Sequence, residues 1–112
     1  MHLRRIMYIE NKSAQPPGRR GVSGVARIGW VVFSNSLQSV YYDGKRFQRD
    51  DSGYKWNHLD VESGERYWIS GPRRDGEDGL YGYRATPIDK DAREEYWTSI
   101  RRQPHLKDRT IS

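Results

Sequence analysis

The chain has 112 residues, a formal net charge of +5 and no cysteine. This length corresponds to one domain, and the lack of cysteine excludes disulfides and thiolate metal sites. No apolar run approaches the roughly 20 residues of a membrane-spanning helix, and the first residues show no signal-peptide pattern, so we expect a cytoplasmic protein without a membrane partner.

Segments rich in β-branched and aromatic residues predict a mainly β fold. A short β-prone run covers residues 5–10, and further strands are expected near residues 25–33, 37–43, 45–49, 54–61 and 66–70. Gly29 interrupts the first long strand and suggests a bulge or a bend. With 8 Tyr and 4 Trp but few aliphatic residues, the chain is expected to have an aromatic core.

Two hairpins follow from the turn residues. Asp43-Gly44 is a strong two-residue hairpin signal, and a second hairpin is expected around residues 62–65. Because side chains alternate between faces, the turn positions also predict which residues lie opposite each other. The expected pairs are Tyr42–Lys45, Tyr41–Arg46, Val40–Phe47, Leu59–Trp68 and Asp60–Tyr67.

One helix is expected near residues 90–102, with Asp89 as its N-cap and an apolar stripe at helical spacing. Residues 84–88 suggest one more short strand. The chain is therefore predicted to be a single β-rich domain over residues 1–104, with a basic Pro/Gly loop at residues 12–24 and a flexible tail at residues 105–112. Its α+β class is expected to take the form of a small, strongly bent antiparallel sheet or an open SH3-like barrel with one C-terminal helix.

A long central stretch, LDVESGERYWISGPRRDGEDGLY at residues 59–81, carries a resemblance to a known family. Together with residues 26–29, 40–47 and 93–97 it resembles small bacterial proteins that often carry the label 1-deoxy-D-xylulose-5-phosphate synthase. The large synthase binds thiamine diphosphate through a motif that begins Gly-Asp-Gly and closes with Asn-Asn. Here Arg74 precedes Asp75-Gly76 and no Asn-Asn follows, so the resemblance implies a single small domain and no synthase chemistry.

Charge is distributed unevenly along the chain. Residues 1–49 carry nine Lys/Arg and two Asp/Glu, a net of +7, whereas residues 50–112 carry eleven Lys/Arg and thirteen Asp/Glu, a net of −2. A basic half can hold nucleic acid or another anionic partner. A solvated surface that keeps a small protein soluble explains the same charge.

An aromatic side chain among cations on a sheet face is typical of a platform for single-stranded nucleic acid. The cluster of Tyr41, Arg46, Lys45 and Arg27 fits this pattern. A cross-strand cation–π contact between Tyr41 and Arg46 is the alternative. Arginines in the two Gly-rich loops favour anions. For Arg73 and Arg74, ion pairs with carboxylates of the same loop are the favoured explanation. The predicted anion or nucleic-acid site comprises Arg19, Arg20, Arg27, Tyr41, Lys45, Arg46, Arg73 and Arg74.

Candidate catalytic groups are sparse. His58 and Asp60 would point the same way on a strand, the spacing of a ligand pair or an oriented base. No third ligand is evident, so a packing or surface histidine is the favoured explanation. The acidic loop around Asp75 fails the calcium-loop pattern at Gly79. We therefore predict no catalytic residues, no metal and no cofactor.

These patterns predict a non-enzymatic binding module that engages an anionic partner, RNA or DNA, through its basic N-terminal half. One alternative is a protein-interaction module that binds by a sheet edge or an aromatic patch. A second alternative is a small hydrolase or isomerase that uses His58 and Asp60.

Overall fold

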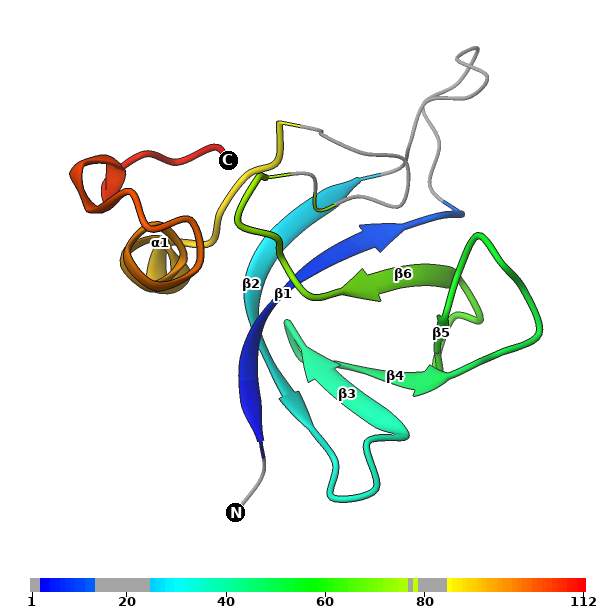
Figure 1. The fold of residues 1–112 in the computed structure, drawn as a ribbon. Helices are drawn as coiled ribbons and strands as arrows, with labels where there is room; N and C mark the ends of the chain where they lie inside the picture. Colours follow the sequence, from blue (N-terminus) through cyan, green and yellow to red (C-terminus); the bar gives the residue numbers. More distant parts are fainter. Residues whose placement is uncertain (1–2, 14–24, 77, 79–84) are drawn as a thin grey trace, which may run out of the picture.

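A computed structural model of the chain describes residues 3–13, 25–76, 78 and 85–112. Its strands form a closed antiparallel barrel in which each strand pairs with the next and the last pairs back to the first (Figure 1). The strands are β1 (Arg4–Asn11), β2 (Ala26–Phe33), β3 (Ser39–Tyr42), β4 (Lys45–Arg49), β5 (His58–Asp60) and β6 (Arg66–Ser70). The predicted mainly β architecture with one C-terminal helix is confirmed, and the barrel is closed rather than open.

Alternation of side chains along the strands divides the core into two clusters. The interior cluster fills the barrel and consists of Ile9, Val31, Val40, Phe47, Tyr67 and Ile69. The outer cluster lies between the outside of β1–β2 and the C-terminal segment and consists of Ile6, Tyr8, Ala26, Ile28, Ile88, Ala92, Tyr96 and Trp97. Tyr8, Tyr96 and Trp97 are fully buried, so the core is aromatic, as expected.

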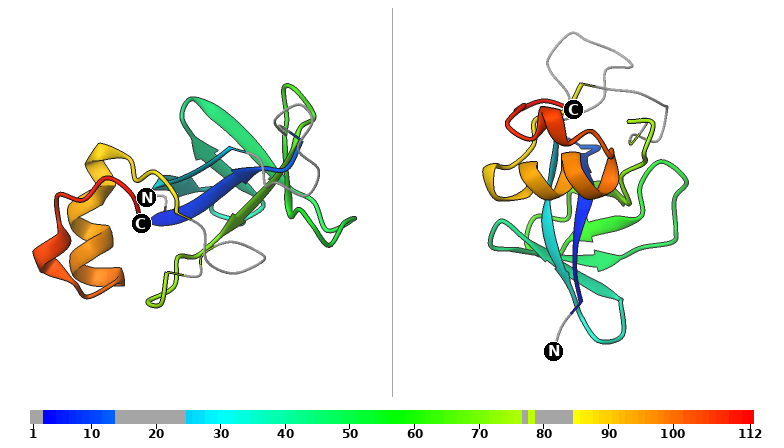
Figure 2. Two further views of the ribbon diagram at one scale, coloured as in Figure 1. Left: turned by 90° about the horizontal axis from the view of Figure 1, so that it is seen from above. Right: turned by 60° about the vertical axis from the view of Figure 1, so that its left-hand side comes forward.

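The helical segment runs without a break through η1 (Lys90–Ala92), α1 (Arg93–Glu95) and η2 (Tyr96–Ile100). It lies against the outside of β1 and β2 (Figure 2). Asp89 occupies the predicted N-cap position, but its side chain makes no capping hydrogen bond. Its carboxylate is bonded to the barrel instead. None of the helices in the described part of the chain is long and apolar enough to cross a membrane.

The segment before the helix covers an exposed stretch of β2. In β2, only Val32 and Phe33 pair with β3, and the free edge near Ile28 is bonded by the chain at Pro87 and Asp89. Ile28 N donates to the Pro87 carbonyl at 2.9 Å, and Asp89 N donates to the Ile28 carbonyl at 2.8 Å. The predicted strand at residues 84–88 reduces to isolated bridges at positions 87 and 88, and residue 84 lies outside the described residues.

Residues 105–112, expected as a flexible tail, fold back onto this segment. The short helix η3 (Pro104–Leu106) overlaps their start. At their end, the Ser112 amide donates to the Thr86 carbonyl at 2.9 Å. The Trp97 indole donates to the Arg109 carbonyl at 2.9 Å. The backbone of the last residues therefore has specific partners in the domain.

The two hairpins differ in how well their register was predicted. All three pairs of the β3–β4 hairpin are confirmed. In the second hairpin, His58 pairs with Tyr67, a shift of two residues from the predicted pairing of Asp60 with Tyr67. The loop is residues 61–64, because the Asp60 carbonyl accepts the Gly64 amide at 2.8 Å and Gly64 has a φ of 75°. A shift of two leaves every side chain on its predicted face.

Candidate functional site

A row of four directly opposed residues crosses the outer face of the barrel. Arg4 on β1 lies opposite Val32 on β2, Val32 lies opposite Tyr41 on β3, and Tyr41 lies opposite Arg46 on β4. We call these four residues the outer row. Their chain neighbours at 31, 40 and 47 are buried in the barrel interior, so the outer row points to solvent. At the usual strand spacing it spans about 14 Å of sheet.

The outer row places an available aromatic ring between two unneutralised cations. Tyr41 is 44% exposed, and the cation–π contacts of the described residues do not include Tyr41 with Arg46. The Arg4 guanidinium lies 4.2 Å from the centroid of the Trp30 ring. Neither Arg4 nor Arg46 belongs to an ion pair within the described part of the chain.

Ordered polar contacts hold Arg46 in place. Its Nε donates to the Ser39 hydroxyl at 3.3 Å, and the same hydroxyl donates to the Gln48 side chain at 3.1 Å. These neutral partners orient the guanidinium without cancelling its charge. Arg46 can therefore still attract an anion from solvent.

Arg27 and Lys45 do not join the outer row, because their side chains belong to the opposite face. They lie at one end of the barrel, which we call the barrel mouth. Its cavity of about 210 Å³ is lined by Ile9, Asn11, Val25, Arg27, Tyr42, Asp43, Lys45, Phe47 and Tyr67. The predicted cluster of Tyr41, Arg46, Lys45 and Arg27 is thus divided between two surfaces.

Arg27 takes part in a contact between the barrel and Asp89, the residue that precedes the helical segment. Asp89 accepts the Tyr42 hydroxyl at 2.5 Å and the Arg27 Nε at 2.6 Å. Burial and the Asp89 carboxylate raise the pKa of Tyr42, and the hydrogen bond to Asp89 raises the pKa of Arg27. We call these three side chains the clasp; both donors keep their protons at neutral pH, so its role is structural.

Gly29 makes room for the clasp. A Cβ at this position would lie 2.2 Å from Asp89 Oδ2 and 2.8 Å from Tyr42 Cε1. Its pairing with Met7 is part of an uninterrupted register, which excludes the bulge that was one of the two predictions for Gly29. The other prediction, a bend, is compatible with the curved course of β2 (Figure 1). The lack of a side chain serves packing between strand and clasp instead.

In the described part of the Gly-rich loop, residues 71–76 and 78, Arg73 interacts with two carboxylates. Arg73 forms an ion pair with Asp75 at 2.9 Å, and its backbone amide donates to the Asp78 carboxylate at 2.6 Å. Burial raises the pKa of Asp78, which also accepts the Tyr96 hydroxyl at 3.2 Å. This pairing favours the interpretation of the loop as internally neutralised. Arg74 is exposed, and Arg19 and Arg20 lie outside the described residues.

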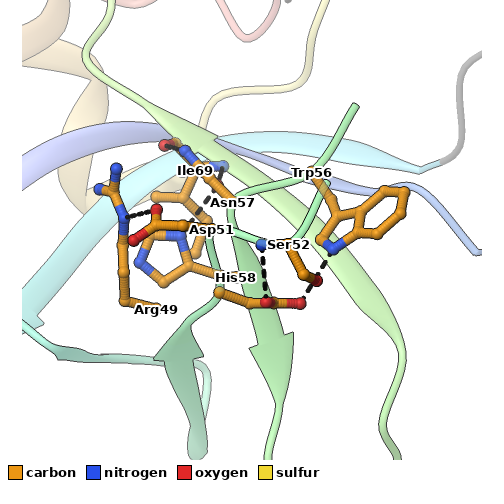
Figure 3. A network of polar contacts seen from close by, with 8 residues as sticks. Arg49, Asp51, Ser52, Trp56, Asn57, His58 and Ile69 are labelled. Carbon is orange, nitrogen blue, oxygen red and sulfur yellow. Dashed lines mark hydrogen bonds and ion pairs between the residues drawn. The ribbon is translucent and has the colours of Figure 1, made fainter. Parts of the chain in front are cut away.

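His58 lies inside the barrel wall, beside Arg49 and Asp51 (Figure 3). It is 4% exposed, and its Nδ1 lies 2.8 Å from the Asn57 side-chain oxygen. The Asn57 amide is fixed by two hydrogen bonds to the backbone of Ile69. Burial lowers the pKa of His58 to about 4, with the nearby Arg49 charge adding to the effect. His58 is therefore neutral and held by packing.

Asp60 also has a structural task. Its carboxylate accepts the amides of Glu62 and Ser63, which hold its pKa below the usual range. Neither His58 nor Asp60 is among the residues that line the barrel mouth beside Tyr67. No group of three or more potential metal ligands occurs within the described ranges.

The stability of the protein is expected to depend on pH through His58. Its pKa of about 4 in the fold lies below the ordinary 6.5, so between these values the unfolded chain binds a proton that the folded chain does not. Stability is then full above pH 6.5 and falls as the pH drops toward 4, with a slope of up to about 1.4 kcal/mol per pH unit. Urea unfolding at a series of pH values measures this slope.

Two variants isolate the contribution of His58 from that of carboxylates titrating in the same range. His58→Gln is expected to flatten the slope, whereas His105→Gln, at an exposed position, is expected to leave it unchanged. An unaltered slope in His58→Gln would show that another group is responsible.

Sequence reasoning missed part of the exposed aromatic surface. The predicted strand at residues 54–61 is shortened to β5 because residues 50–57 form a loop around Trp56, whose indole donates to Asp50 at 3.0 Å. The Arg66 guanidinium lies 4.4 Å from the Trp56 ring centroid, and Tyr54 is 79% exposed. Sequence reasoning also missed Arg4 as a member of the outer row. The long connection between β1 and β2 leaves the register of these two strands unspecified by the sequence.

Comparisons with protein-family models, with curated proteins and with solved structures find no match to this chain. The family resemblance noted from the sequence stays a prediction. The functional argument consequently depends on the geometry of the chain itself.

Proposed function

We propose that this protein is a non-enzymatic module that binds single-stranded nucleic acid on the outer face of β1–β4. The observation that carries the proposal is the outer row, in which an exposed tyrosine lies between two arginines that have no carboxylate partner among the described residues. This surface is not covered by the helical segment, which packs on the other part of β1–β2.

Each side chain of the outer row has a defined task in such a complex. Tyr41 offers a ring for a base, and stacking of this kind contributes about 1–3 kcal/mol per base. Arg4 and Arg46 neutralise phosphates on either side, which releases counterions. Val32 supplies apolar area between Arg4 and Tyr41. An unstacked base is needed to reach the ring, so single strands are favoured over duplexes.

The charges elsewhere direct a polyanion toward this face. The groove beside the clasp is lined by Arg27 and Lys90 but also by Asp43, Asp89 and Asp91, so its carboxylates repel phosphate. Closure of the barrel gives each described strand two paired neighbours, which weakens the alternative of protein binding by strand addition. Binding of a protein through exposed aromatic residues stays the alternative to nucleic-acid binding.

The double variant Tyr41→Ala/Arg46→Glu is expected to weaken oligonucleotide binding at least about tenfold, because one stacking contact and one phosphate contact are lost. The measurement is a fluorescence anisotropy titration with labelled single-stranded RNA, single-stranded DNA and duplex at two salt concentrations. The control Tyr54→Ala/Lys107→Glu makes the same kinds of change at exposed positions outside the outer row and is expected to bind as the wild type does.

Three results would count against the proposal. Wild-type affinity weaker than about 10⁻⁴ M at low salt lies below ordinary non-specific binding. Equal weakening in both double variants would indicate general electrostatic attraction. A protein partner captured from lysate, retained after nuclease treatment and in high salt but lost with Tyr41→Ala/Arg46→Glu, would favour the rival.

A further inference from the structure

The barrel mouth combines an apolar floor with a polar rim. Ile9, Phe47 and Tyr67 belong to the interior cluster and form the floor, where the Phe47 and Tyr67 rings lie 4.5 Å apart at a tilt of 55°. Tyr42 forms one wall and is held in place by the clasp. A preformed apolar cavity with a few convergent polar groups is the usual form of a ligand site.

Two polar groups at the rim have no partner among the described residues that would compete with a ligand. The Lys45 ammonium forms no hydrogen bond or ion pair with the described residues, although it lies near enough to Tyr67 to lower the pKa of the phenol against the larger effect of burial. The Tyr67 hydroxyl accepts the Asn11 amide at 3.3 Å, which leaves its own hydrogen to donate. Both groups point to a ligand with hydrogen-bond acceptors.

The size of the cavity limits that ligand to a single ring. Pockets for drug-sized ligands have volumes of roughly 300–1,000 Å³, and the cavity of the barrel mouth has about 210 Å³. The carboxylate of Asp43 lines the same rim and suits a ligand that also carries hydrogen-bond donors. Arg27 adds little positive charge because it is neutralised by Asp89. A neutral heteroaromatic ring with acceptors and donors on its edges fits these constraints better than a simple anion.

We propose that the barrel mouth binds one nucleobase of the strand that lies on the outer row, an inference that depends on the proposed function. The β3–β4 hairpin connects the two surfaces: Tyr41 and Arg46 form its outward pair, and the next pair, Tyr42 and Lys45, belongs to the mouth. One pair is a step of about 3.4 Å along the strand. A nucleotide next to the one stacked on Tyr41 can therefore turn its base into the cavity.

The test uses NMR spectra of the ¹⁵N-labelled full chain with two probes. Uridine monophosphate is expected to shift the amides of Ile9, Lys45, Phe47 and Tyr67, whereas ribose 5-phosphate, which lacks the base, is expected to leave them unshifted. Lys45→Met and Tyr67→Phe should each lower the affinity for uridine monophosphate about tenfold. This is the usual effect of losing one hydrogen bond that involves a charge or a buried group. Lys55→Met removes an exposed lysine outside the mouth and should have no effect.

Oligonucleotide titrations separate failure of this inference from failure of the proposed function. If a single-stranded oligonucleotide shifts the amide signals of the outer row but not those of the barrel mouth, the proposed base site is wrong and the proposed binding on the outer row is supported. If no oligonucleotide binds but the monophosphate fills the mouth, the outer row is wrong. Equal shifts with ribose 5-phosphate, or affinities unchanged in both Lys45→Met and Tyr67→Phe, would overturn the base site. Spectra of both variants that match the wild type confirm that they are folded.

Discussion

Replacing Trp97 with alanine is expected to lower the free energy of unfolding by about 3–5 kcal/mol, the usual cost of truncating a fully buried tryptophan. Trp97 is 0% exposed and packs in the outer cluster against β1–β2. Its ring also lies 5.0 Å from the Arg101 guanidinium and 5.8 Å from that of Arg109. The same substitution therefore removes the apolar contact of the helical segment and the anchor of the last residues.

Urea unfolding followed by circular dichroism measures this loss. Trp56→Ala is the matched control, because Trp56 is only half-buried and lies in a loop, and it is expected to cost clearly less. The slope of the unfolding free energy against urea concentration increases with the surface that is exposed on unfolding. A slope in Trp97→Ala equal to that of the wild type would indicate that the barrel and the helical segment unfold together. Equal destabilisation by the two variants would contradict the assignment of Trp97 as the main link between the segment and the barrel.

Gly29→Ala is expected to destabilise the protein by about 1–3 kcal/mol, the range for overpacking a filled site. The added methyl group would overlap Asp89 and Tyr42, and relieving the overlap requires the clasp to open. Gly71→Ala is the control, because a Cβ there meets nothing within 4 Å, and its effect should stay within about 0.5 kcal/mol.

A double-mutant cycle identifies the cause of the Gly29 effect. In an Asp89→Ala background the closest overlapping atom is gone, so Gly29→Ala should cost less than it does in the wild type. Equal costs in the two backgrounds would show that the carboxylate is not what limits the space beside Gly29. A cost near zero in the wild type would show that the clasp adjusts freely.

Local sequence signals predicted the parts of the fold that depend on neighbouring residues. Asp43 and Gly44 both adopt positive φ, 51° and 73°, as a two-residue hairpin turn requires. That turn placed Tyr41 opposite Arg46 correctly, and with it the centre of the outer row. The helical segment was equally visible, because its apolar stripe needs only chain periodicity.

Pairing between distant segments could not be read in the same way. The β1–β2 register, which brings Arg4 opposite Val32, joins two strands separated in sequence by residues 12–25. This separation is too long for a two-residue turn signal to set the pairing. The role of the Asp89 carboxylate depends on its meeting Tyr42 across 47 positions of sequence. Its local signature predicted the N-cap position but not this contact. Lys45 was grouped with Arg46 although alternation of side chains already places these two neighbours on opposite faces. Only the tertiary structure shows that Lys45 lines the barrel mouth.

The sequence by itself therefore determined most of the strands, the β3–β4 hairpin, the helical segment and the aromatic character of the core, because turn chemistry and periodicity act over a few residues. Only the tertiary structure decided that the barrel closes, that the helical segment packs outside it, and that the basic residues separate into an outer row and a barrel mouth. The physical reason is that strand pairing and burial are settled between segments far apart in the chain, where no local preference specifies the register.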